Sequence, residues 1–199
     1  MTEKRYDRAY FDRWYRHPQH RVRARAEIAR RVAMVVALAE YYLGRRVTNV
    51  LDVGCGEGIW RAPLRALRPE IDYLGLDASA YVVARYGRSR NLRLAKFGDL
   101  AELRFDRRFD VIVCSDVLHY LRAPEIVRGL SGFGELLEGL AFIETFTSRD
   151  PIEGDTLGFI RRTPAWYRRT IADAGLMAIG THSYLSPRLL RSVSALERA

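Results

Sequence analysis

Hydrophobic residues along this chain follow two spacings, one typical of helices and one of buried strands. From residue 21 to 43, apolar side chains recur every three or four positions and a glycine follows at 44. This spacing predicts one long amphipathic helix. Short, nearly continuous apolar runs predict strands instead. These runs lie at residues 47–53, 72–76, 92–96, 109–116 and 140–145.

Helical segments are predicted between these strands, at residues 57–67, 79–86 and 124–137, and a further helix follows at 164–173. Thr163 and Pro164 suit the N-cap and first position of that last helix. Strands that alternate with helices predict an α/β fold with a doubly wound, mostly parallel sheet and helices on both faces. At 199 residues the chain suits one domain, residues 1–199, with residues 1–44 as an N-terminal helical cap.

The end of the first strand carries the clearest chemical pattern, Leu-Asp-Val-Gly-Cys-Gly-Glu-Gly at residues 51–58. Glycines at alternate positions let a backbone turn sharply and approach a bound ligand closely. A dinucleotide site requires G-x-G-x-x-G, but position 59 is Ile, and no P-loop lysine follows. The pattern therefore predicts a flat polar ligand other than a nicotinamide or flavin dinucleotide.

Polar residues also follow the other predicted strands. Asp77, Asp99, Ser115 and Asp116 all fall where a strand ends. Because parallel strands end at the same edge of a sheet, these side chains are expected beside the glycine turn. Two have simpler interpretations that stay open, since Asp99 suits a helix cap and Asp116 suits a turn.

Charge adds one alternative to this picture. The net charge is +9, and residues 1–31 hold ten basic against four acidic residues. Such a basic segment is able to bind RNA, although a solvated helix face explains it more simply. The 29% charged and 48% hydrophobic residues are typical of a soluble globular protein.

Several classes of protein do not fit the sequence. No apolar run approaches the roughly 18 residues of a membrane span, and the N-terminus lacks the apolar core of a secretory signal, so we expect a cytoplasmic protein without a membrane partner. Two cysteines, Cys55 and Cys114, are too few for a disulfide framework. His17, His20 and His182 are scattered, so no metal is expected. The oligomeric state is left open.

Four motifs in order and spacing give a resemblance to a known family. They are residues 51–58, the segment Tyr-Leu-Gly-Leu-Asp at 73–77, Gly-Asp-Leu at 98–100 and residues 109–121. Together they resemble the class I S-adenosylmethionine-dependent methyltransferases, over roughly residues 45–182. The resemblance implies a Rossmann-like sheet of seven (or six) strands, with S-adenosyl-L-methionine as cofactor.

The same resemblance implies a role for each motif. The acid and glycine turn would hold the methionine end, the second motif would bind the ribose, the third would meet the adenine, and the fourth would border the transferred methyl group. The implied cofactor-binding residues are Asp52, Gly54, Cys55, Gly56, Gly58, Asp77, Ala78, Gly98, Asp99, Leu100, Ser115 and Asp116.

For catalysis, His119 lies where this family often places a catalytic or substrate-contacting residue, and the alternative is that it only packs against the cofactor. Residues 159–162 suggest a mixed apolar and cationic wall beside the acceptor, although a core aromatic and solvated arginines explain them equally well. We expect a methyltransferase that modifies oxygen or nitrogen of a small acceptor. An RNA methyltransferase and a non-catalytic cofactor-binding protein are the alternatives. The candidate substrate residues are Tyr10, Trp14, His119, Tyr120, Phe146, Phe159 and Arg161.

The C-terminal part departs from the family pattern. The family's sheet ends in a hairpin, but only residues 176–182 are clearly strand-like. Leu189, Leu190, Val193 and Leu196 have helical spacing instead. The last antiparallel strand is therefore expected to be short or absent.

Overall fold

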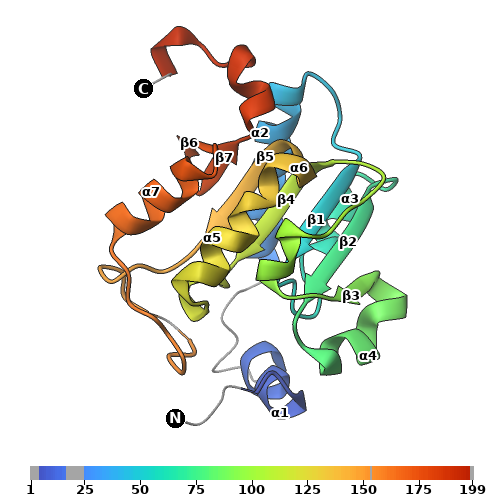
Figure 1. The fold of residues 1–199 in the computed structure, drawn as a ribbon. Helices are drawn as coiled ribbons and strands as arrows, with labels where there is room; N and C mark the ends of the chain where they lie inside the picture. Colours follow the sequence, from blue (N-terminus) through green and yellow to red (C-terminus); the bar gives the residue numbers. More distant parts are fainter. Residues whose placement is uncertain (1–4, 17–24, 153, 198–199) are drawn as a thin grey trace.

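The computed structural model describes residues 5–16, 25–152 and 154–197, and contains a seven-stranded sheet in the order β3-β2-β1-β4-β5-β7-β6 (Figure 1). Strands β1 to β5 pair in parallel, and β7 is antiparallel to both β5 and β6, so β6 has the same direction as the other five. The predicted fold class is confirmed. The strands are β1 Asn49–Val53, β2 Asp72–Asp77, β3 Leu92–Leu94, β4 Phe109–Ser115, β5 Leu137–Glu144, β6 Met177–Gly180 and β7 Ser183–Leu185.

The strand β1 lies at the centre of the parallel part, between β2 and β4. Asp52 is level with Gly75 of β2 and with Val113 of β4. The strand order reverses at β1, because β2 and β3 are added on one side of it and β4 and β5 on the other. Ligands of doubly wound sheets bind at such a reversal, beyond the carboxyl ends of the strands.

Each face of the sheet has its own hydrophobic core because strand side chains alternate in direction. Val50, Val111 and Leu140 belong to one cluster, whereas Leu51 and Ile112 belong to the other. The first face is covered by α2 Arg25–Leu43, α3 Arg61–Leu67 and α4 Ala80–Arg90. The second is covered by α5 Ala123–Ser131, α6 Phe133–Leu136 and α7 Pro164–Asp173.

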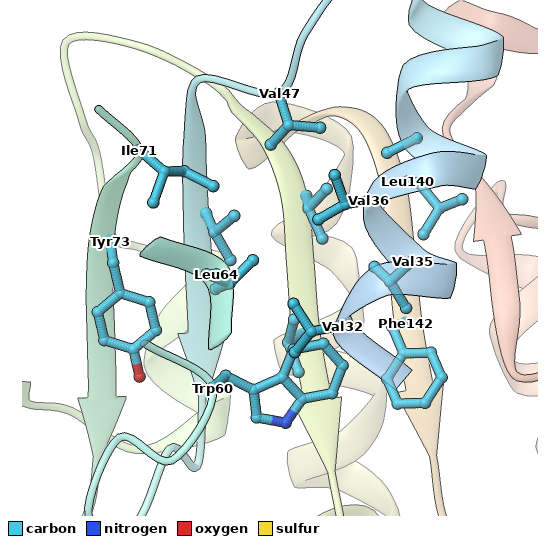
Figure 2. Close-up of a cluster of buried hydrophobic side chains, with 14 of the residues drawn as sticks. Val32, Val35, Val36, Val47, Trp60, Leu64, Ile71, Tyr73, Leu140 and Phe142 are labelled. Atoms are coloured by element: carbon cyan, nitrogen blue, oxygen red, sulfur yellow. The ribbon is translucent and has the colours of Figure 1, made fainter. Parts of the chain in front are cut away.

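Helix α2 is part of this core. Figure 2 shows Val32 of α2 beside Trp60 and Val35 beside Phe142, on the first face of the sheet. The rings of Trp60 and Phe142 lie 5.3 Å apart. The predicted amphipathic helix is confirmed from residue 25 onward, while residues 21–24 of that prediction, with His17 and His20, lie outside the described residues.

Residues 6–16 form a separate cover at the carboxyl end of the sheet, which we call the N-terminal strap. It contains the short helix α1 Arg8–Phe11 and a π-helical turn, Asp12–Arg16. The Asp7 carboxylate caps α1 by accepting from the Tyr10 N–H over 3.1 Å. Figure 1 shows α1 beyond the ends of β1 and β2.

Three predicted helices differ from those observed. The helix predicted at 79–86 continues through Gly87 to Arg90 and ends at Asn91, which has a positive φ of 58°. The segment after the glycine turn becomes α-helical only at Arg61, because positive φ angles at Gly54, Gly56 and Gly58 hold a turn first. The predicted helix at 124–137 is two helices, α5 and α6, separated at Gly132. A Cβ at Gly132 would overlap the backbone of Leu100, so this break lets the chain pass close to its neighbour.

The C-terminal hairpin is present, with a last strand of three residues. The predicted strand at 176–182 is wrong in its last two residues, because Thr181 and His182 form the turn between β6 and β7. Both have positive φ, 49° and 60°, as tight hairpin turns require. The final helical pattern forms two 3-10 helices, Pro187–Ser192 and Ala195–Glu197.

Candidate active site

The glycine turn after β1 is fixed to the neighbouring strand β2. The backbone N–H groups of Gly54 and Cys55 both donate to the carbonyl oxygen of Leu76, over 2.7 and 3.1 Å. The φ angles of Gly54, Gly56 and Gly58 are 70°, 52° and 71°. A chain in this left-handed region turns sharply, and it does so here at the reversal of the sheet.

Asp77 connects this turn to the start of α4. One carboxylate oxygen accepts from the Gly56 N–H and the other from the Ser79 N–H, both over 2.8 Å. Burial raises the pKa of Asp77, and these two bonds oppose that rise. Each carboxylate oxygen has a second acceptor position, so Asp77 keeps the capacity to bind two hydroxyl groups of a ligand.

Asp52 lies behind the turn, in the first face of the sheet. It is only 2% exposed, and its carboxylate accepts from the Tyr73 hydroxyl over 2.7 Å. Burial raises the pKa of Asp52 to about 7; the bond from Tyr73 opposes this rise and the charge of Asp77 adds to it. Near neutral pH, Asp52 therefore exchanges between its charged and neutral forms.

The third motif forms a 3-10 helix, η2 Phe97–Ala101, beside β3. Asp99 caps it by accepting from the Lys96 N–H over 2.8 Å, which is the simpler role that its position suggested. Leu100 is fully buried, whereas Gly98 and Asp99 are partly exposed. The capping bond uses one lone pair of Asp99, so acceptor capacity for a ligand amine remains.

Ser115 and Asp116 follow β4 and meet the end of β5. The Ser115 hydroxyl donates to the Glu144 carboxylate over 2.7 Å, and the Asp116 N–H donates to the Glu144 carbonyl oxygen over 3.0 Å. Arg31 of α2 contacts both carboxylate oxygens of Glu144 at 2.5 Å. Asp116 has a φ of 61°, a strained value that is frequent at functional sites.

His119 belongs to a second 3-10 helix, η3 Leu118–Tyr120, and is only 1% exposed. Its ring contacts the rings of Tyr120, Phe146 and Phe159. Its Nδ1 lies 3.1 Å from the Thr145 hydroxyl and accepts from the Phe146 N–H over 3.4 Å. A neutral imidazole whose Nδ1 accepts must carry its proton on Nε2.

The other candidate substrate residues fall into two groups. Tyr10 of the strap and Tyr120 are close enough to influence each other electrostatically, and the Tyr120 hydroxyl donates to the Asp155 carbonyl oxygen over 2.6 Å. The strap and the loop after β5 therefore lie near each other at the carboxyl end of the sheet. Trp14 contacts the Arg13 guanidinium on the strap itself, and Arg161 is exposed.

Within residues 159–162, where a mixed apolar and cationic wall is predicted, Phe159 lies against the His119 ring and Arg161 is exposed. Arg162 donates to the carbonyl oxygen of Leu121 over 2.6 Å, and its guanidinium lies 4.8 Å from the centre of the Trp166 ring. These contacts join the loop to η3 and α7. Arg162 therefore connects parts of the fold to one another, and no pattern in the sequence indicates these contacts.

Several residues of this site were missed by sequence reasoning. Tyr73 belongs to the motif at 73–77 but had no predicted role, and Ser79 and Glu144 adjoin motifs without a pattern of their own. Tyr15 and Arg16 of the strap contact the turn at Gly56 and Glu57. The i, i+4 spacing of Phe11 and Tyr15 indicates a helical face, but nothing in it identifies the turn as their partner.

A cavity of about 190 Å³ lies away from this site, in the loop before β4. Its lining includes Arg107 and Arg108, which pair with Asp72 and Glu135. It is at the amino ends of the strands, opposite to where such sheets bind ligands.

Within the described residues, no group of three or more potential metal-binding side chains is found. No helix in those residues is long and apolar enough to span a membrane.

Comparisons with known proteins agree with this geometry. A family model described as a methyltransferase domain matches residues 17–193, which is most of the chain. Over 79 residues the chain is 37% identical to trans-aconitate 2-methyltransferase of Deinococcus radiodurans. This match covers 39% of the chain and only 30% of that relative.

Solved structures agree in fold. Magnesium protoporphyrin IX methyltransferase of Synechocystis PCC 6803 matches with a TM-score of 0.59 and 18% identity, covering 90% of this chain and 95% of the other. A sugar N-methyltransferase from Streptoalloteichus sp. ATCC 53650 matches with a TM-score of 0.60 and 20% identity, covering 79% and 82%. At these identities the likeness concerns the fold alone.

The sheet order, the turn and the family match define the class of protein. The chain belongs to the methyltransferase domain family. It is a class I methyltransferase, of the class that uses S-adenosylmethionine as methyl donor.

Proposed function

We propose that this chain transfers the methyl group of S-adenosylmethionine to an oxygen or nitrogen atom of a small-molecule acceptor. One observation carries the proposal: Asp77 is held by the N–H groups of Gly56 and Ser79, so that a carboxylate with spare acceptor capacity stands beside a glycine turn. The turn and carboxylate fit an adenosyl group whose ribose carries two hydroxyls.

Different residues would bind different parts of the cofactor. Asp77 would accept from the ribose hydroxyls, and Asp99 with Leu100 and Ala78 would meet the adenine. Asp52 would face the ammonium through the turn, and it binds a cation better in its charged form. Bound there, the cofactor supplies a methyl group on a good leaving group, so positioning contributes most to the rate.

His119 fits a positioning role better than a basic one. Its Nδ1 accepts from the Phe146 N–H, which places the proton of the neutral ring on Nε2. A protonated Nε2 is able to donate but not to take a proton from an acceptor. We therefore propose that His119 orders the loop after β5 and holds Tyr120, Phe146 and Phe159 around the acceptor.

The strap and the loop after β5, which both lie over the site, favour a small acceptor. The strap and the loop after β5 approach each other at Tyr10, Tyr120 and Asp155. Extended acceptors would have to displace both. The partial match to trans-aconitate 2-methyltransferase and the fold of a sugar N-methyltransferase support the same choice, since both names describe small acceptors.

RNA is the less favoured acceptor. Two arginines of the basic N-terminal stretch are paired in the structure, Arg16 with Glu57 and Arg31 with Glu144. Paired arginines contribute less to phosphate binding than free ones. RNA affinity that falls steeply with salt would revive this alternative.

Calorimetry with S-adenosylmethionine and its demethylated product tests the cofactor site. Asp77→Asn should weaken binding by about tenfold or more, since a charged acceptor of two hydroxyls is lost. The matched control is Asp72→Asn, at the other end of the same strand, where Asp72 pairs only with Arg107 among the described residues. Equal binding by parent and Asp77→Asn would contradict the assignment.

Incubation with methyl-labelled cofactor and an extract of host metabolites tests the reaction and identifies the acceptor by product mass. Labelled small molecules are the expected result. Label in RNA alone would support the alternative, and binding without any labelled product would indicate a non-catalytic protein.

A further inference from the structure

We propose that the N-terminal strap, residues 6–16, is a latched cover of the cofactor site, closed by Tyr15 over Gly56 and held by Arg16 on Glu57. This inference rests on the proposed function, because it assigns the cofactor to the glycine turn. It adds a residue to the site and a barrier to cofactor exchange.

The contact between Tyr15 and Gly56 is the first observation. A Cβ built on Gly56 would overlap the Tyr15 hydroxyl oxygen, so the phenol lies directly on the turn. Tyr15 as a whole is partly exposed, but its hydroxyl end is enclosed. Burial raises the pKa of that hydroxyl well above its ordinary value, and Tyr10 and Asp77 add to the rise. The phenol therefore lies among the cofactor-binding residues.

Arg16 is the second observation. Its guanidinium forms an ion pair with Glu57, which lies inside the turn between Gly56 and Gly58. The same guanidinium donates to the Tyr86 hydroxyl of α4 over 2.9 Å. Glu57 is 8% exposed, so this bond is made near the interior and fixes the strap to the turn itself.

A second fastening lies at the other end of the strap. The Ser79 hydroxyl donates to the Tyr6 carbonyl oxygen over 2.6 Å. The Ser79 N–H donates to Asp77, so one residue holds both the strap and the proposed ribose acceptor. The two fastenings stand on either side of the turn, one on Glu57 and one beyond Asp77.

Phe11 anchors the middle of the strap. It is 2% exposed, and its ring stacks on Tyr81 of α4 with centres 5.9 Å apart. The contacts at Tyr6, Tyr15 and Arg16 are polar or partly exposed, and those are the ones that release most readily. A cofactor that reaches Gly56 and Asp77 must move Tyr15 aside or pass beneath it. The rates of cofactor entry and exit should therefore depend on the latch.

Arg16→Gln tests the latch, with Arg8→Gln as a matched control. Both replace a strap arginine, but Arg8 contacts Asp12 on the outer face of the strap and its side chain is 76% exposed. Stopped-flow measurements with the demethylated cofactor should show entry and exit rates about three- to tenfold higher for Arg16→Gln, the range for one partly buried ion pair. Arg8→Gln should match the parent.

The substitutions Tyr15→Ala and Tyr15→Phe distinguish the effect of the aromatic ring that covers Gly56 from the effect of the hydroxyl group. Tyr15→Ala removes the ring over Gly56 and should raise both rates as Arg16→Gln does. Tyr15→Phe keeps the ring and should leave entry close to that of the parent. Unchanged rates in both Arg16→Gln and Tyr15→Ala would overturn the proposal even though the cofactor binds.

Trypsin cleavage after Arg13 gives a readout that needs no cofactor. Arg16→Gln and Arg8→Gln each lose one cleavage site and keep Arg13, so the two variants are directly comparable. Faster cleavage in Arg16→Gln supports the latch, and equal cleavage in parent and variant overturns it. Failure of the parent to bind cofactor would count against the proposed function alone, since this assay would still report on the latch.

Discussion

The hydroxyl of Tyr73 on β2 donates to the carboxylate of Asp52 on β1 over 2.7 Å, and both side chains are almost fully buried. The bond joins adjacent strands directly behind the glycine turn. A buried carboxyl group without a partner costs far more than one that accepts a hydrogen bond. Tyr73 therefore makes it possible for an acid to lie inside the core, where we propose that it faces the ammonium group of the cofactor.

Removal of this bond should be costly. We expect Tyr73→Phe to lower the free energy of unfolding by about 1–3 kcal/mol, since it leaves the Asp52 carboxyl without this donor. Tyr81→Phe is the matched control, because the Tyr81 hydroxyl is buried and has no hydrogen-bond partner among the described residues. Its loss should be neutral or stabilising. Urea unfolding of both variants tests this, and equal effects would show that the bond contributes nothing.

The raised pKa of Asp52 predicts a pH dependence. An unfolded aspartate titrates near ~3.9, whereas burial holds Asp52 at a pKa of about 7. Between those values the folded protein keeps a proton that the unfolded chain has lost, so stability from this group falls as pH rises to 7 and is flat above.

Asp52→Asn should abolish the fall in stability with rising pH that is due to Asp52. Its free energy of unfolding relative to the parent should rise by about 2 kcal/mol between pH 5 and 7, at about 1.4 kcal/mol per pH unit. Urea unfolding of both proteins at pH 5, 6, 7 and 8 measures the difference. A difference that stays constant over this range would show that Asp52 is ionised throughout in the folded protein.

The fold was predictable because its information is local. Apolar runs placed the five parallel strands, and Thr163 was correctly predicted as an N-cap, where it accepts from the Trp166 N–H over 3.2 Å. The terminal hairpin was not, because Thr181 and His182 adopt positive φ without the Asn-Gly pair that usually indicates such a turn. Tertiary pairing of β7 with β5 sets that conformation, and single-chain patterns do not contain it.

Only those site residues that lie at the ends of strands could be placed from the sequence. Asp52, Asp77 and Asp116 could be placed at one edge because parallel strands end together. The contacts of Tyr15 with Gly56 and of Arg31 with Glu144 join residues far apart in the chain. No spacing encodes such contacts, since they depend on how the strap and α2 lie on the finished sheet.

Asp110 should show the opposite pH dependence to Asp52. It accepts from Arg45 over 2.6 and 3.0 Å, and from the Thr48 N–H and hydroxyl over 2.7 and 2.9 Å. Burial acts to raise the pKa of Asp110, but these bonds together hold it below its ordinary value. Its stabilisation is therefore complete above the unfolded pKa of ~3.9 and is lost as pH falls below that value.

Asp110→Asn should lower the free energy of unfolding by about 2 kcal/mol at pH 7, because Arg45 and the Thr48 groups lose a charged acceptor. The deficit should shrink below pH ~4, where unfolding of the parent is favoured by proton uptake at Asp110 in the unfolded chain. Thermal or urea unfolding from pH 3 to 7 measures it. A deficit that does not change with pH would mean that packing, rather than charge, is what the substitution removes.

Gly56→Ala tests whether the Tyr15 phenol limits the turn. Gly44 has a similar φ, 65° against 52°, but a Cβ there would meet nothing within 4 Å. Gly44→Ala should therefore cost only the backbone strain of about 1–2 kcal/mol. Gly56→Ala should cost this strain together with the overlap at the Tyr15 hydroxyl, measured by urea unfolding.

A double-mutant cycle separates the backbone strain at Gly56 from the overlap with the Tyr15 hydroxyl. In a Tyr15→Ala background the overlap is gone, so Gly56→Ala should then cost about as much as Gly44→Ala, and the coupling measures the contact. The strap also has a way to relieve the overlap, which is to lift from the turn. If it does, Gly56→Ala in the otherwise unchanged protein will be cleaved faster after Arg13, whereas Gly44→Ala will not. No coupling and no change in cleavage would mean that the phenol does not rest on Gly56 in solution.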